Sequence, residues 1–443
     1  MKKFSLLFLI IFSIIIFTQF NCKSPTAPSG SGISISVADV SCTEVWLNLS
    51  ANNVTLPANI IIKKNGNNFL NLNLTTKDTT LYDSTLLPSQ TYTYQAQYNK
   101  GFAFERSGVA TAKTLDTTSS NFIWQTYTFG SPAAGSSYLN DVSIINDTDI
   151  IAVGAVYLTD STGHADLFPY NLVQWDGVKW NLKKISVEYK GNKTIAPLTG
   201  INVLSDRSIV LSSGLPYIPD ANGGWKLYQL WDMGILNEND GSVNHIWGLS
   251  IDNLFFVGNK GTIVFYSSDT WQKIESGTTL PIQNIWGNAN SLTGKSQILC
   301  VASDKYYNQG NELIEIKNNN TAIAIPDSGL PWSLSSVWFI PNRKYYIAGD
   351  GVFQTTSLDK RWTEVKGLPR IYSDAIRGIN YNEIVVSGSN GTLSYFNGVR
   401  WHNYINNPLP YISGRLVSVS IKGNTIAAVG FNGEQAYIVI GRR

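Results

Sequence analysis

Histidine, cysteine and charged side chains are scarce in this sequence, and their scarcity excludes several kinds of chemistry. Of the 443 residues only three are cysteine and three are histidine, and 14% are charged. No group of cysteines and histidines has the spacing of a zinc site. The sequence also lacks a phosphate-binding loop and a nucleophile elbow. We therefore predict no metal and no cofactor.

Long hydrophobic runs are also missing, with one exception at the start of the chain. Met1–Lys3 is basic, and the apolar run Phe4–Phe17 that follows is short for a membrane span but typical of a secretory signal. The run is followed by Cys22, an arrangement that resembles a bacterial lipoprotein signal. The match departs at Gln19, where that family prefers Leu, and at Asn21, where Gly or Ala is usual.

The lipoprotein resemblance implies a division of the first 32 residues. Residues 1–21 would be the signal peptide, and residues 22–32 would be the lipidated Cys22 followed by a tether rich in Ser, Pro and Gly. The protein would then be exported and anchored by lipid to the bacterial cell envelope. The alternative is a plain cleaved signal with an incidental cysteine.

Net charge is absent once residues 1–21 are removed. The basic residues fall from 33 to 31 because Lys2 and Lys3 are lost, and 31 acidic residues match them. A neutral chain without a basic stripe makes nucleic acid an unexpected partner. A disulfide between Cys42 and Cys300 would have to cross two domains, so we predict two isolated buried thiols.

Residues 33–117 are predicted to form a β-sandwich. Apolar residues alternate with polar ones along the first strands, as in Val45, Leu47 and Leu49. The pair Asn65-Gly66 predicts a tight hairpin turn because both residues accept positive φ.

One segment of this module carries a family resemblance. Leu86–Tyr94, with the sequence LLPSQTYTY, resembles the fibronectin type III signature, in which Tyr92 would form the tyrosine corner. Trp46 departs from that family because it lies on the face opposite Leu47, and Leu49 would fill its place. The resemblance implies a spacer or adhesion module of about 85 residues rather than an enzyme.

Residues 119–443 contain a repeated phrase, a short apolar run that closes on a small residue. Its seven copies are Ile150–Gly154, Ile209–Gly214, Leu254–Gly258, Ile298–Ala302, Tyr345–Gly349, Ile384–Gly388 and Ile426–Gly430. Their ends lie 39 to 60 residues apart, mostly near 44, which is typical of a β-propeller with four strands in each blade. The fold class is therefore predicted to be all-β, a sandwich followed by a seven-bladed propeller.

The last blade is predicted to borrow a strand. The seventh unit has only three strands before the chain ends, whereas residues 121–129 have the pattern of a fourth strand. We expect these residues to complete the seventh blade and close the ring.

Tryptophans recur at two positions of the repeat. Trp247, Trp286 and Trp338 share a first-strand position and are predicted to pack between blades. The fourth strands of blades 1, 3, 5 and 6 are expected to open with a tryptophan, at Trp180, Trp271, Trp362 and Trp401 respectively. Blades 2 and 4 lack this tryptophan.

The blades loosely resemble those of sialidase-type and photosystem-assembly-type propellers. Ser268–Trp271 and Ser357–Trp362 are similar to the Asp-box of that family, although both lack its glycine. These boxes are structural turns in the family, so the resemblance does not imply catalysis.

Ligands of propellers usually meet one face, which the inter-blade loops and the loops between second and third strands build. Three of the latter loops are expected to be long: 155–171, 214–225 and 303–312. The candidate binding residues are the aromatic and histidine side chains of this face: Tyr157, His164, Tyr170, Tyr217, Tyr306, Tyr307, Trp332, Tyr372 and Tyr411. They would stack on sugars or anchor a protein; the alternative is that they pack on one another to hold the loops.

No catalytic residues are predicted. Arg370, Arg377 and Arg415 lie near first strands but do not match the arginine triad of a sialidase. Asp160 and Asp166 share a loop, yet paired carboxylates act only at defined separations that the sequence does not give. The leading hypothesis is a monomeric, non-catalytic binding protein that recognises a protein or glycan. The alternatives are a carbohydrate-active hydrolase or lyase using the same face, and an assembly factor of the envelope.

Overall fold

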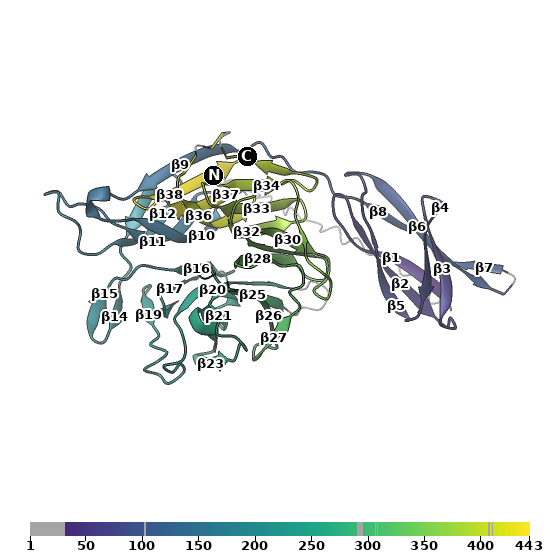
Figure 1. The fold of residues 1–443 in the computed structure, drawn as a ribbon, viewed down its shortest axis with the longest axis horizontal. Helices are drawn as coiled ribbons and strands as arrows, with labels where there is room; N and C mark the ends of the chain where they lie inside the picture. The colour runs from purple at the N-terminus through teal and green to yellow at the C-terminus, as the bar shows by residue number, and fades with distance from the viewer. Residues whose placement is uncertain are drawn as a thin grey trace, which may run out of the picture. The chain divides into compact units, whose positions relative to one another are not determined.

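The computed structural model describes residues 32–101, 103–289, 296–305, 307, 309–405, 408–409 and 411–443. They form two compact units, one containing β1–β8 and the other β9–β38 (Figure 1). The predicted signal peptide and the lipidation site Cys22 lie outside the described residues. Within the part that is described, no helix has both the length and the hydropathy needed to cross a membrane.

The first unit consists of two antiparallel sheets. One sheet has the order β1 (Gly32–Val40), β2 (Val45–Asn52) and β5 (Asp78–Asp83). The other has the order β4 (Asn67–Leu74), β3 (Ala58–Lys64), β6 (Thr91–Lys100) and β7 (Ala103–Arg106), and β8 (Ala110–Lys113) also pairs with β6. Alternate residues of these strands, such as Leu47, Leu49 and Ile62, are fully buried, as the alternating pattern predicts.

Two local features of this unit follow from its sequence. Asn65 and Gly66 have φ of 50° and 82°, so the turn between β3 and β4 has the two left-handed residues that were predicted. Trp46 lies on the face of β2 opposite to that of Val45 and Leu47, yet all three residues are buried. The Trp46 ring is covered by Tyr82, with 5.5 Å between the ring centroids.

The second unit contains seven four-stranded antiparallel sheets among the described residues. The first three, innermost strand first, are β10 (Tyr138–Asn146), β11 (Asp149–Val156), β12 (Tyr170–Trp175), β13 (Trp180–Lys183); β16 (Gly200–Val203), β17 (Ile209–Ser212), β18 (Pro216–Pro219), β19 (Trp225–Leu227); and β20 (Val243–Ser250), β21 (Asn253–Gly258), β22 (Ile263–Ser267), β23 (Thr270–Ile274).

The next three sheets have the same order. They are β24 (Ile282–Ala289), β25 (Ser296–Asp304), β26 (Gln309–Lys317), β27 (Thr321–Ile325); β28 (Leu334–Ile340), β29 (Lys344–Gly349), β30 (Gly351–Thr355), β31 (Thr363–Glu364); and β32 (Ser373–Asn380), β33 (Glu383–Gly388), β34 (Leu393–Phe396), β35 (Trp401–Asn403). Each first strand lies beside the first strands of both neighbouring blades, so the sheets form the ring of a β-propeller.

The seventh sheet closes this ring. It consists of β36 (Arg415–Lys422), β37 (Thr425–Phe431), β38 (Ala436–Arg442) and β9 (Ile123–Phe129). β9 pairs with β38 in an antiparallel register that places Ile123 opposite Arg442 and Phe129 opposite Ala436. The prediction that residues 121–129 complete the last blade is therefore confirmed.

The repeated phrase corresponds to the second strand of each blade, which is buried on both faces. In β11, for example, every residue after Asp149 is buried. A strand covered on both faces needs apolar residues at consecutive positions, which explains the continuous run. This pattern made the blades countable from the sequence.

The first-strand tryptophans pack between blades as predicted. A Cβ atom on Gly287 would lie 2.3 Å from the ring of Trp247, and one on Gly378 would lie 2.6 Å from the ring of Trp338. The neighbouring blade therefore approaches each indole so closely that only glycine fits opposite it.

Blade 2 differs from the prediction. Residues 214–225 were expected to be a long loop, but β18 and β19 lie within 216–227, and Trp225 opens the fourth strand that was thought to lack a tryptophan. The sequence also gave no sign of the small hairpin β14 (Val187–Tyr189) and β15 (Asn192–Thr194), which lengthens the connection from blade 1. Two short 3-10 turns, η1 (Pro132–Ala134) and η2 (Asn259–Gly261), complete the described elements.

Candidate functional site

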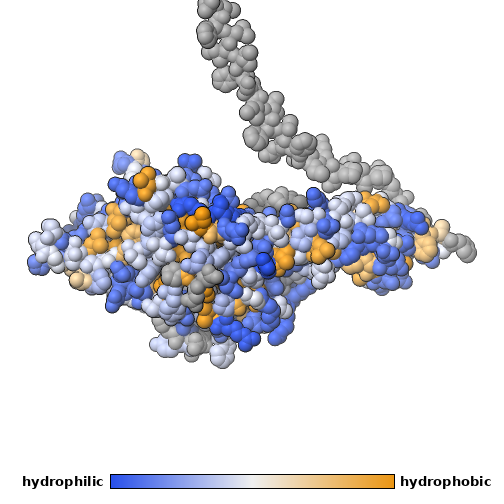
Figure 2. All heavy atoms as spheres, turned by 90° about the horizontal axis from the view of Figure 1, so that it is seen from above, coloured by the Kyte–Doolittle hydropathy of each residue, from blue (hydrophilic) through white to orange (hydrophobic). Residues whose placement is uncertain are grey.

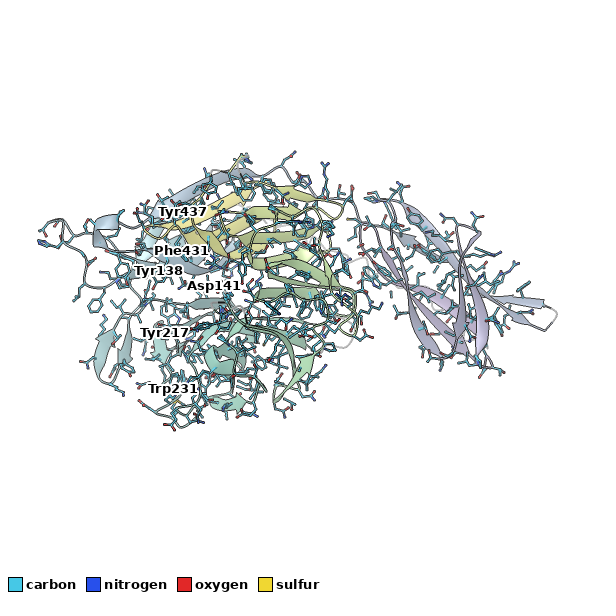
Figure 3. The ribbon with its side chains drawn as sticks, viewed as in Figure 1. Tyr138, Asp141, Tyr217, Trp231, Phe431 and Tyr437 are labelled. Carbon is cyan, nitrogen blue, oxygen red and sulfur yellow. The ribbon has the colours of Figure 1, made fainter. Side chains whose placement is uncertain are left out.

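A polar cavity of about 400 Å³ occupies the middle of the ring. All seven blades contribute to it, each from the start of its first strand or from the residue just before. The charged and imidazole side chains that line it are Asp141, His245, Lys305, Asp374, Arg377 and Arg415. Figure 3 shows one of them, Asp141, toward the middle of the ring. Serine, threonine, asparagine and glutamine residues provide most of the remaining wall.

A second pocket of about 550 Å³ adjoins the central cavity and shares Lys305 and Arg415 with it. Its other lining residues are Trp332, Ser333, Asp350, Tyr372 and Ser389. Each of these comes from an inter-blade loop or from a connection between second and third strands, in blades 4 to 6. We call this the outer pocket; its volume lies in the range of small-ligand sites.

The outer pocket has an aromatic rim. Trp332 is 68% exposed, whereas Tyr372 is half-buried. The Tyr372 hydroxyl lies 3.2 Å from Ser333 Oγ, and its ring packs on the Arg415 guanidinium, 5.3 Å from the ring centroid. The Tyr372 ring is thus fixed in place, while the Trp332 indole presents a free face.

Arg415 and Asp374 form an ion pair between blades 6 and 7, in which Asp374 is buried and the Arg415 side chain is 40% exposed. Arg415 Nε donates to Asp374 Oδ2 at 3.2 Å, and Arg415 Nη2 donates to the other carboxylate oxygen. Burial raises the pKa of Asp374, and the Arg415 contact opposes that rise. The pair offers little free charge because each partner neutralises the other.

Arg377 is held deeper in the cavity by its own blade and its neighbours. Its Nη1 donates to Ile376 O at 2.7 Å and to Ser336 Oγ at 2.9 Å, and its guanidinium lies 4.6 Å from the centroid of the Trp286 ring. Burial lowers its pKa to about 10, although Asp141 partly opposes this. These contacts tie blades 4, 5 and 6 together from the inside.

Asp141 connects blades 7, 1 and 2 from the inside of the ring. Its carboxylate accepts bonds from Ser418 Oγ at 2.7 Å, Val142 N at 2.9 Å and Ile201 N at 3.1 Å. Burial raises its pKa against the effect of these donors. Arg377 and Asp141 therefore have structural partners on the ring itself.

Lys305 differs from the other charged residues of the cavity. It lies just after β25, and no hydrogen bond or ion pair to its ammonium is found among the described residues. Burial, which is the largest effect, and the nearby Arg415 lower its pKa to about 8 against the opposing effect of Asp374.

His245 lies in the same cavity, on β20, and its imidazole likewise has no hydrogen-bond partner among the residues that the structure describes. Burial, followed by Lys305 and Arg377, lowers its pKa to about 3, so the imidazole is neutral at physiological pH. Across the described ranges, no group of three or more His, Cys, Asp and Glu residues is placed to hold a metal ion.

The structure brings together only some of the predicted site residues. Trp332 and Tyr372 both line the outer pocket, and Tyr411 is 59% exposed near it, with its hydroxyl 3.5 Å from Asn390 Oδ1. Tyr307 is 75% exposed beside the Lys305 loop but lines neither cavity, and Tyr306 lies outside the described residues.

Tyr217 is not a loop residue. It lies in β18, pairs with Leu211 and Leu227 on either side, and is only 3% exposed (Figure 3). The expected placement is wrong because β17 connects to β18 through a turn of three residues. A buried ring has no free face for stacking.

The predicted residues of blade 1 lie apart from both cavities. Tyr157 is half-buried, and Tyr170 opens β12 with the Lys184 ammonium 4.6 Å from its ring centroid. His164 is exposed in a loop whose turn is held by Asp160, and its Nδ1 lies 2.8 Å from Thr162 Oγ1. Thr162 lies in the same loop as His164, whereas Lys184 follows β13, so the contact of Tyr170 is made outside its loop.

Sequence reasoning missed the two most distinctive residues of the cavity, Lys305 and His245. His245 is one of three histidines and lies one position before the apolar core of a first strand, which was the only available signal. Lys305 lies in the predicted loop 303–312 beside Tyr306 and Tyr307, and nothing in its local sequence indicated a binding residue. The two described cysteines, Cys42 and Cys300, are in contrast buried thiols that form no disulfide, as predicted.

No protein-family model matches the chain, and no curated protein is significantly similar to it in sequence. Solved structures with a similar arrangement include the WD40 β-propeller domain of Doa1, with 11% identity and a TM-score of 0.49 over 72% of this chain and 97% of that one. The C-terminal WD40 domain of Sif2 has 14% identity and a TM-score of 0.40, over 79% and 91% of the two chains. A DUF4784 family protein from Bacteroides caccae has 8% identity and a TM-score of 0.30, over 77% and 97%. Such values convey nothing about ligands, and the propeller fold rests on the sheet topology of the chain itself.

Proposed function

We propose that this protein is a non-catalytic glycan-binding protein whose ligand occupies the outer pocket. The observation that carries the proposal is the exposed indole of Trp332 over a concave pocket of about 550 Å³. An indole with one free face stacks on the apolar face of a sugar ring, while hydroxyl and charged groups such as Ser389 and Lys305 supply directional contacts.

A glycan fits this site better than a folded protein does. Protein partners need roughly 800 Å² of contact on each side and an apolar centre. The outer pocket is lined by two aromatic, two serine and three charged side chains, which is a polar lining for a protein interface centre. Elsewhere on the molecule, the side drawn in Figure 2 is mostly hydrophilic, with hydrophobic residues scattered in small patches. A concave site that combines polar side chains with two aromatic rings suits a sugar chain.

The remaining parts of the chain have supporting roles in this proposal. The first unit would be a fibronectin type III spacer, which its two sheets and the segment Leu86–Tyr94 support. Lipidation at Cys22 would hold the protein at the bacterial envelope with the propeller projecting from it. Labelling with a clickable fatty acid tests the anchor, since a wild-type chain without label would contradict it.

The test of binding is a glycan array with the purified protein, repeated with Trp332→Ala and with Tyr189→Ala as a control. Tyr189 is a partly exposed tyrosine on β14, away from the outer pocket residues. We expect Trp332→Ala to weaken binding by about tenfold, a change of about 1.4 kcal/mol, because aromatic anchors dominate small sites. Binding that both variants retain equally, or a blank array, would refute a glycan site at Trp332.

A carbohydrate-active hydrolase or lyase is the second candidate function. One observation favours it: Lys305, with a pKa of about 8, and the neutral imidazole of His245 line the same cavity. Groups with shifted pKa values in a cleft are typical of acid–base sites. Product analysis of each bound glycan separates the two candidates, because released or unsaturated sugars would show turnover.

A further inference from the structure

The charges of the central cavity are unequal. Lys305, Arg377 and Arg415 carry positive charge, and two carboxyl groups, Asp141 and Asp374, face them. Protonation of either carboxyl group would leave the cavity more positive still, so the sign of the excess does not depend on its ionisation. His245 adds no charge because burial keeps its imidazole neutral.

The three cations differ in what surrounds them. Arg415 is neutralised by Asp374, while Arg377 is bound to Ser336 and Ile376 O and lies over the Trp286 ring. Both Nη groups of Arg377 therefore have acceptors on the ring, and Arg415 has a carboxylate partner. Lys305 is the remaining cation, and its ammonium has no partner among the described residues.

An unpaired, partly desolvated ammonium is costly to the folded protein, so it calls for a ligand. Lys305 lies where the central cavity and the outer pocket meet, because it lines both. An anionic group on a ligand in the outer pocket would therefore reach it. Asp350, the carboxylate among the residues that line that pocket, is solvent-exposed, and water weakens its repulsion of an anion.

We propose that the glycan bound in the outer pocket is acidic, and that its single negative charge, a sugar carboxylate or a sulfate ester, pairs with the Lys305 ammonium while a sugar ring stacks on Trp332. This inference rests on the proposed function and specifies the class of its ligand. A monoanion matches one free ammonium; a phosphate dianion would remain half neutralised.

The test compares charged oligosaccharides with uncharged counterparts of the same backbone. We would measure by calorimetry the binding of oligogalacturonate and its carboxyl-reduced form, and of a sulfated galactan oligosaccharide and its desulfated form. We expect at least one charged member to bind ten times or more tightly than its neutral counterpart, and the preferred pair tells a carboxylate from a sulfate. Equal binding within both pairs would overturn the acidic ligand but leave a glycan site intact, whereas failure of all four, together with a blank array, would overturn the proposed function as well.

Variants of Lys305 test whether this residue causes the preference for charged over uncharged oligosaccharides. Lys305→Met keeps the length of the stem and removes the charge, so it should abolish the preference for the charged member, whereas Lys305→Arg should retain most of it. Lys360→Met, an exposed lysine of blade 5, is the control and should change nothing.

Thermal unfolding of the same variants excludes a structural explanation. Because the ammonium has no partner to lose, Lys305→Met should unfold at the same temperature as the wild type or higher. A clear drop in its unfolding temperature, or a preference for acidic oligosaccharides that survives in Lys305→Met, would overturn the proposal.

Discussion

Trp124→Ala tests how strongly the first strand of the propeller holds the ring closed. Trp124 lies in β9 opposite Gly441 of β38, and a Cβ on that glycine would come within 2.5 Å of the indole. The indole centroid lies 4.8 Å from that of Tyr404 and 5.4 Å from that of Phe122. Removing the indole therefore opens a gap between blades 6 and 7 as well as along the β9–β38 ladder.

The magnitude follows from these contacts. Replacing a buried tryptophan by alanine costs about 3–5 kcal/mol. The cost is smaller here, because Trp124 is only partly buried and because its buried Nε1 has no hydrogen-bond partner among the described residues, a defect that alanine removes. We expect a loss of about 2–3 kcal/mol in the free energy of unfolding of the propeller. Trp124→Phe keeps the ring contacts and also removes the unpaired N–H, so it should cost less than about 1 kcal/mol.

The assay is denaturant unfolding followed by circular dichroism, with hydrogen exchange of the β38 peptide to locate the effect. Trp332→Ala serves as a control because that ring is 68% exposed and should contribute within about 0.5 kcal/mol. The reasoning would be refuted if Trp124→Ala unfolded like Trp332→Ala and left the exchange of residues 436–442 unchanged.

Three further predictions follow from the packing and the charges. Binding of an acidic oligosaccharide should be constant between about pH 5 and 7, where the sugar anion and Lys305 are both charged, and should weaken above about pH 8, because Lys305, whose pKa is lowered to about 8, loses its charge there. The bound anion raises that pKa, so the midpoint should shift upward, and pH-independent binding between about pH 7 and 10 would contradict the role of the ammonium. Gly378→Ala should lower the stability of the propeller by about 1–3 kcal/mol in thermal unfolding, because its Cβ would lie 2.6 Å from the Trp338 ring, whereas Gly108→Ala, with open space around it, should be near neutral. Cys300 is fully buried, and burial raises its pKa, so peptide mass spectrometry should detect its modification by a thiol reagent only after denaturation; rapid modification of the native protein would contradict its burial.

Much of the propeller could be predicted from the sequence because its second strands are buried on both faces and give a continuous apolar signal. The closing strand was also recognisable, since a seventh unit with three strands needs a partner for the edge of β38. Blade 2 was misread because Pro216 and Pro219 bracket a strand of four residues, and proline usually signals a loop. The hairpin β14–β15 escaped because strands of three residues are too short to show a period.

The candidate site was harder to predict, because it depends on which loops meet. Trp332 and Tyr372 were found because both belong to inter-blade loops, which build one face of a propeller. The sequence around Lys305 gave no signal. Lys305 stands out because its ammonium has no hydrogen-bond or ion-pair partner among the described residues, which becomes visible only once the blades are packed into the ring. Tyr217 was wrongly placed in a loop because Pro216 and Pro219, which flank it, usually signal a loop.

The pairing of β9 with β38 also sets the order of events during synthesis. A ribosome makes β9 before every other strand of the propeller, yet its partner is the last strand to emerge, so the ring stays open until the whole domain exists. Each intermediate blade can settle against its predecessor, but the final step joins segments at the two ends of the domain and is the slowest contact to find. During this interval β9 of one nascent chain can pair with β38 of another, so the yield of monomer on refolding should fall as the protein concentration rises.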